Sequence, residues 1–108
     1  EDAEQNSCCD FAFSIAVPHW NEKSKGDMEE LTKQEGINSY KMFMAYKDSL
    51  MLNDNDLLKT FHHVKDIGGV AKVHAENGAI IAENQKRLLA QGVTGNFSSF
   101  VHLISMVL

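Results

Sequence analysis

Residues 38–46 read NSYKMFMAY, a run that is almost continuously apolar or aromatic. A run of this length and composition is typical of a strand that is covered on both faces, as strands in parallel sheets are. Two other runs have the length and apolar character of a strand, FAFSIAV at residues 11–17 and VAKVHAE at residues 70–76. The sequence therefore predicts three β-strands.

A helical pattern follows each predicted strand. The first lies around residues 25–35, the second begins at Asn53, and the third covers residues 79–91. Asn53 is a predicted N-cap, with Asp56 three residues later in a capping-box-like arrangement. A strand–helix unit repeated three times implies parallel strands, because each helix carries the chain back across the sheet. This α/β pattern fits an arc of a (β/α)8 barrel or half of a doubly wound sheet, and periodicity does not separate the two.

The composition narrows the class of protein. The 108 residues are 44% hydrophobic and 23% charged, which is the profile of one globular unit. The net charge of −5, with lysine and arginine scattered, argues against a nucleic-acid partner. No apolar run approaches the roughly 20 residues that a membrane helix needs, so we expect no membrane association. The adjacent Cys8 and Cys9 are expected to be reduced and buried, which favours an intracellular location.

The central strand carries a lysine where a charge is costly to bury. Side chains alternate along a strand, so Lys41 shares one face with Ser39 and Phe43. In a barrel this face would point inward, and the functional interpretation of Lys41 then needs a reaction that removes its positive charge. A neutral amine can take up carbon dioxide to form a carbamate, which behaves as a carboxylate and can bridge two metal ions. The alternative is a lysine whose ammonium group reaches the rim of the sheet.

The third strand carries a histidine on the equivalent face. Neutral imidazole is the commonest metal ligand in proteins, which makes His74 a candidate, although a structural histidine is the alternative. Glu76 and Asn77 follow closely and could orient the imidazole ring. His62 and His63 lie on the second predicted helix beside lysines, and we expect both to be solvent exposed.

Two stretches resemble a known family. Residues 36–48 (GINSYKMFMAYKD) and residues 66–78 (DIGGVAKVHAENG) resemble the dihydropyrimidinase family of the amidohydrolase superfamily. The segments CCDFAFSIAV, EELTKQEG and AQGVTG are similar to that family too, so the resemblance covers roughly residues 8–95. It implies a partial (β/α)8 TIM barrel of the metal-dependent amidohydrolase type, with about three βα units in this chain. The barrel is therefore preferred over the doubly wound sheet.

The resemblance also implies roles for three residues. Lys41 matches the carboxylated lysine that bridges two zinc ions, His74 matches a histidine that binds one of them, and Tyr46 matches the tyrosine that holds substrate and stabilises the oxyanion. The implied catalytic residues are thus Lys41 and Tyr46. The implied reaction is hydrolysis of a small cyclic amide, dihydrouracil or dihydrothymine, to an N-carbamoyl-β-amino acid in pyrimidine catabolism. The implied protein is a cytoplasmic homotetramer with two zinc ions per subunit.

The sequence also departs from the family pattern. The family needs a His-x-His pair, a later histidine and an aspartate as further ligands, and no His-x-His occurs here. Residues 96–108 (NFSSFVHLISMVL) differ from the family's continuation, so we expect residues 1–95 to be a barrel segment and residues 96–108 an aberrant or alternatively spliced end. A chain lacking these ligands is expected to be inactive alone. The alternative interpretation is a segment of a non-catalytic collapsin response mediator, a branch that usually lacks the bridging lysine.

Overall fold

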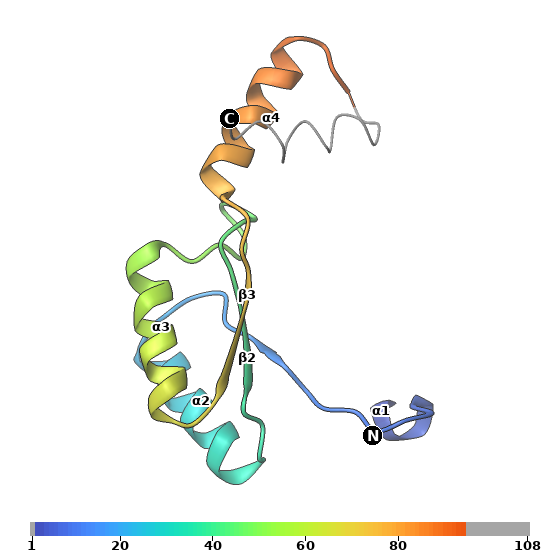
Figure 1. The fold of residues 1–108 in the computed structure, drawn as a ribbon, viewed down its shortest axis with the longest axis vertical. Helices are drawn as coiled ribbons and strands as arrows, with labels where there is room; N and C mark the ends of the chain where they lie inside the picture. Colours follow the sequence, from blue (N-terminus) through green and yellow to red (C-terminus); the bar gives the residue numbers. More distant parts are fainter. Residues whose placement is uncertain (1, 95–108) are drawn as a thin grey trace.

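The computed structural model describes residues 2–94. Three parallel strands form one sheet in the order β1-β2-β3. The strands are β1 (Ile15–Ala16), β2 (Ser39–Phe43) and β3 (Val70–His74). The helices are α1 (Asp2–Asn6), α2 (Glu22–Gln34), α3 (Asp54–Asp66) and α4 (Gly78–Ala90). The predicted α/β class with three parallel strands is therefore confirmed (Figure 1).

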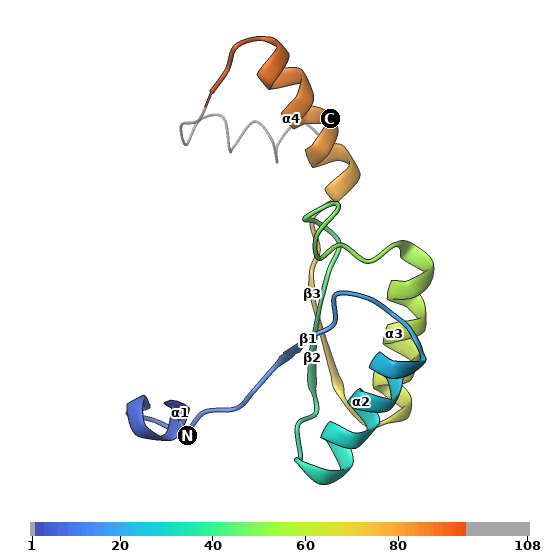
Figure 2. The same ribbon diagram turned by 180° about the vertical axis from the view of Figure 1, so that it is seen from behind.

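Helices cover one face of the sheet. α2 and α3 lie together on the same side of β2 and β3, as the two opposite views show (Figure 1, Figure 2). The β2 side chains that point to this side, Tyr40 and Met42, are fully buried. They form the centre of a core with Val17, Met28, Leu52, Leu57 and Val64. No described helix covers the opposite face of the sheet, on which Ser39, Lys41 and Phe43 remain partly accessible.

A buried tyrosine joins the central strand to the first connecting helix. The Tyr40 hydroxyl donates to the Met28 carbonyl oxygen (2.8 Å) and lies 2.7 Å from the Thr32 hydroxyl. A phenol that is removed from water needs such partners, because an unpaired buried hydroxyl is costly. The contact fixes β2 against α2 and leaves the alternate residues of β2 on the uncovered face.

The strand ends differ from the prediction. β1 comprises two residues rather than residues 11–17, and Phe11 and Phe13 before it are 44% and 54% exposed. β1 pairs only with β2 among the described strands, so its lead-in segment has no second neighbour to bury it. The prediction that Cys8 and Cys9 are buried is wrong, because they lie in this same lead-in and are exposed free thiols.

The helix starts follow from asparagine caps. Asn53 caps α3 as predicted, and its side-chain oxygen accepts from the Asp56 amide (3.0 Å). α2 begins three residues earlier than predicted, because Asn21 and Ser24 form a reciprocal capping box. None of the described helices is long and apolar enough to span a membrane. The predicted segment 96–108 lies outside the described residues.

One of two adjacent histidines is buried. His62 is exposed as predicted, but the prediction for His63 is wrong, because only 7% of it is exposed. His63 lies on the face of α3 that also carries Thr60 and Val64, both of which are buried. Its ring packs edge-on against Trp20 at 5.4 Å between centroids, and its Nε2 lies 3.2 Å from the Lys25 carbonyl oxygen. His63 therefore joins α3 to α2.

Candidate active site

Two of the predicted site residues lie on the uncovered face of the sheet. Phe43 and His74 are the last residues of β2 and β3 and are partners in the strand register. Lys41 lies two residues before Phe43, on the same face, and its register partner is Lys72. The predicted side of the sheet for Lys41 and His74 is thus confirmed, since both lie opposite the buried Tyr40 and Met42.

The third predicted residue joins them through a cluster of rings. The Tyr46 ring lies 5.3 Å from the His74 ring and 5.6 Å from the Phe43 ring, measured between centroids. The Phe43 and His74 rings are 6.1 Å apart, and the Lys41 Nζ lies 5.3 Å from the Phe43 centroid. Phe43 therefore contacts all three predicted residues. Strand alternation predicts that Phe43 lies on the same face as Lys41, but no function was predicted for Phe43. Its two-residue spacing from Lys41 is the one feature of the sequence that indicates the contact.

Tyr46 stands in a loop rather than in the strand. The prediction that the central strand extends to residue 46 is wrong, because β2 ends at Phe43 and Tyr46 has a φ of 63°. This left-handed conformation is uncommon for a bulky residue and is found where surrounding contacts enforce it. The Tyr46 carbonyl oxygen accepts from three successive backbone amides, those of residues 49–51, at 3.1–3.3 Å. The turn leaves the Tyr46 side chain 52% exposed at the end of the sheet.

Backbone hydrogen bonds hold this loop against the end of β3. The Met44 amide donates to the His74 carbonyl oxygen (2.9 Å), and the Gly78 amide donates to the Met44 carbonyl oxygen (2.9 Å). Gly78 is buried, and a Cβ atom there would lie 2.8 Å from the Met44 carbonyl oxygen and 2.9 Å from the Ala45 Cα, both backbone atoms. The close approach thus requires glycine, and it fixes the loop that carries Tyr46 relative to His74.

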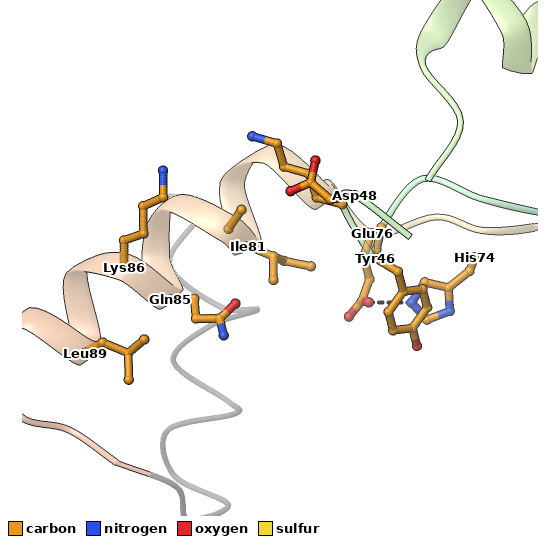
Figure 3. Close-up of a pocket in the computed structure, with 12 residues that line it drawn as sticks. Tyr46, Asp48, His74, Glu76, Ile81, Gln85, Lys86 and Leu89 are labelled. Atoms are coloured by element: carbon orange, nitrogen blue, oxygen red, sulfur yellow. Dashed lines mark hydrogen bonds and ion pairs between the residues drawn. The ribbon is translucent and has the colours of Figure 1, made fainter. Parts of the chain in front are cut away.

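Glu76 contacts the candidate histidine. Its carboxylate oxygen Oε2 lies against the His74 Nε2, as the dashed line in Figure 3 marks. An ionised carboxylate only accepts hydrogen bonds, so a hydrogen bond at this contact needs a proton on Nε2. Glu76 therefore lies where the sequence suggested. The corresponding suggestion for Asn77 is wrong, because its side-chain oxygen accepts from the Ile80 amide (3.1 Å) and caps α4.

A cavity opens between the loop after β2 and α4. Its volume is about 590 Å³, within the range of small-molecule sites. Tyr46, His74 and Glu76 line one end, and α4 lines the other (Figure 3). Lys41 is not among the lining residues. Nothing in the sequence pattern of α4 distinguishes a cavity wall from an exposed helix face, so its lining residues were not predicted: Ile81, Ala82, Gln85, Lys86 and Leu89.

The donor set fits part of a metal site. His74 offers an imidazole and Lys41 a side-chain amine on the same face of adjacent strands. Among residues 2–94 no three histidine, cysteine, aspartate or glutamate side chains gather into a metal-binding group. The His74 imidazole suits one position of a metal site, whereas the Lys41 amine would suit a second only after losing its positive charge, and a complete site needs further ligands.

Comparisons with known proteins identify the segment. No family model matches the chain. It is 47% identical over 93 residues to a dihydropyrimidinase of Rattus norvegicus and 46% identical over 93 residues to the human dihydropyrimidinase-related protein 5. These matches cover 86% of this chain but only 18% and 16% of the relatives, so the chain spans less than a fifth of their length.

A solved structure agrees with the sequence matches. The crystal structure of dihydropyrimidinase from Brevibacillus agri superposes with a TM-score of 0.75 at 40% identity, over 79% of this chain and 18% of that one. The predicted resemblance is thus confirmed, and the chain is related over most of its length to a segment of dihydropyrimidinases.

Proposed function

We propose that this chain, a relative of one segment of the dihydropyrimidinases, forms an arc of the barrel of a metal-dependent hydrolase that opens small cyclic amides. One observation carries the proposal. Lys41 and His74 come from two adjacent strands and Tyr46 from the loop after β2, and they meet around the Phe43 ring at one end of a parallel sheet. In α/β proteins this end of the sheet is where ligands bind.

The one-sided cover of the sheet supports a barrel. A doubly wound sheet carries helices on both faces, whereas every helix of a (β/α)8 barrel lies outside. α2 and α3 share one face, and the three strands follow one another in sequence order. The uncovered face with Lys41 and His74 then becomes the barrel interior. Further strands, and further metal ligands, come from outside the described residues.

Lys41 acts in this proposal as a carbamate. The Lys41 nitrogen bonds to the carbon of carbon dioxide, one C=O electron pair moves to oxygen, and the nitrogen releases a proton to solvent. The register supports this change of charge, because Lys41 stands directly opposite Lys72. Like charges at opposed positions destabilise a strand pair, and an anionic carbamate would turn the repulsion into attraction. Lys41 and His74 would then hold two zinc ions together with ligands from the rest of the protein.

Tyr46 acts on the substrate. Zinc, when bound, supplies Lewis acidity and a nucleophilic water. The Tyr46 hydroxyl would donate a hydrogen bond to the oxyanion that develops as the ring amide of dihydrouracil or dihydrothymine is attacked. Cleavage of the ring C–N bond gives an N-carbamoyl-β-amino acid. The ring contacts with His74 and Phe43 orient the Tyr46 phenol while its exposure leaves it open to a ligand.

Intact mass and metal content of the full-length protein test the proposal. We expect one carbon dioxide adduct and about two zinc ions per subunit, and Lys41→Ala should remove both. Lys59→Ala, on the exposed side of α3, is the matched control and should change neither. A wild-type protein that carries no adduct and no metal would contradict the catalytic function.

A non-catalytic adaptor is the second candidate. The observation that favours it is the 46% identity to the human dihydropyrimidinase-related protein 5, which is nearly as high as the 47% identity to the rat dihydropyrimidinase. In that case Lys41 and His74 are retained without a complete ligand set. The same measurement of zinc and mass distinguishes the two functions, because we expect a purified adaptor to contain no zinc and no adduct on Lys41.

A further inference from the structure

We propose that Glu76 is a positioning residue that fixes the tautomer and orientation of His74. The inference rests on the proposed function only for its metal-binding consequence. Its structural basis is the contact between the Glu76 carboxylate and the His74 Nε2. Both side chains are partly accessible, 30% for Glu76 and 33% for His74, so the pair lies at the cavity and not in the core.

The backbone places Glu76 for this role. Gly78 is held to the loop after β2 by its hydrogen bond to Met44, and Asn77 is engaged as the cap of α4. These two restraints fix the chain immediately after Glu76. The two-residue spacing brings the carboxylate to the same side as the His74 ring, while Tyr46 covers the ring at 5.3 Å. The imidazole is thus restrained by the Glu76 carboxylate and by an aromatic neighbour.

The contact determines which nitrogen is available to a ligand. A carboxylate only accepts, so it selects the tautomer with the proton on Nε2 and leaves the lone pair on Nδ1. Metal-binding histidines are generally oriented in this way, with the second ring nitrogen donating to a carboxylate or carbonyl, and loss of such a partner lowers metal affinity by roughly 10–100-fold. Glu76 therefore prepares Nδ1 of His74 as the donor atom.

The first test does not require metal. In full-length, metal-free protein labelled with 15N-histidine, the His74 signal, assigned with His74→Gln, should show the Nε2-protonated tautomer. Glu76→Ala should give a mixture of tautomers, and Glu76→Gln should restore most of the preference, because its amide oxygen still accepts. Glu83→Ala, an exposed glutamate on α4, is the matched control. An unchanged His74 tautomer in Glu76→Ala would overturn the inference.

The second test measures zinc. In competition with a chromophoric chelator, Glu76→Ala should weaken zinc binding by roughly 10–100-fold, while Glu83→Ala should leave it unchanged. If the wild type binds no zinc but Glu76→Ala still changes the His74 tautomer, the proposed function is refuted and the positioning role of Glu76 is retained. A zinc-binding wild type whose affinity is unaffected by Glu76→Ala would refute the role of Glu76 at the metal and leave the proposed function intact.

Discussion

The two tyrosines of the chain perform separate tasks at the level of single residues. Tyr40 is buried and donates to the Met28 carbonyl oxygen, whereas Tyr46 is half exposed and faces the cavity. In the full-length protein, Tyr46→Phe should lower kcat by about 10²–10³-fold, because the phenol is the proposed donor to the oxyanion. Steady-state kinetics on dihydrouracil provides the measurement.

Tyr40→Phe is the matched control for that prediction. It removes the same hydroxyl group from the helix-covered face, so it should leave kcat nearly unchanged. It should lower the free energy of unfolding by about 1–2 kcal/mol, since the Met28 and Thr32 partners lose their hydrogen bond. Unchanged turnover in Tyr46→Phe would show that Tyr46 does not stabilise the oxyanion.

Gly78 permits the contact between the two loops of the site. Gly78→Ala would place a Cβ atom 2.8 Å from the Met44 carbonyl oxygen and 2.9 Å from the Ala45 Cα. Backbone atoms cannot move away as easily as a flexible side chain, so urea unfolding of Gly78→Ala should show a free energy of unfolding lower by about 1–3 kcal/mol. Gly26→Ala, within α2 and with no atom near the added methyl group, should instead stabilise by about 0.5–1 kcal/mol. Equal effects of the two substitutions would contradict the proposed role of the close approach.

At the level of elements, the period of a strand is what made the shared face of Lys41 and His74 predictable. Alternation is a local property of an extended chain, so the sequence alone placed Lys41 and His74 on one face. The ends of the strands depend on neighbours that are distant in sequence. β2 ends at Phe43, and the next residue, Met44, is hydrogen-bonded to His74 and Gly78, contacts that no pattern within NSYKMFMAY indicates.

The packing of α2 against α3 is another feature that a local sequence pattern does not predict. The charged neighbours of His63 predict an exposed side chain, but Trp20 and the Lys25 carbonyl oxygen bury it. His63→Ala should therefore cost about 2–4 kcal/mol in urea unfolding of the full-length protein, because a large buried group and its contacts are lost. His62→Ala, one residue away and exposed, should stay within about 0.5 kcal/mol of the wild type. Similar losses for both histidines would contradict the packing.

At the level of the whole molecule, one of the two faces of the sheet is covered by no helix among the described residues. In residues 2–94 the outer edges of β1 and β3 pair with no further strand, and Val70 on β3 is 54% exposed. Open strand edges beside exposed apolar side chains promote pairing with other chains. In the proposed barrel, neighbouring strands close both edges, so the segment depends on the rest of the protein for its solubility.

The 108-residue chain produced alone should therefore self-associate. Light scattering after size-exclusion chromatography should give a mass that rises with protein concentration. Val70→Lys should reduce that rise, because a charge on an edge strand opposes further pairing. Val73→Lys, on the side of β3 that packs against the core, should unfold the segment and not make it more soluble. A concentration-independent monomer with cooperative unfolding would show that the three-stranded unit is stable without the remaining strands of a barrel.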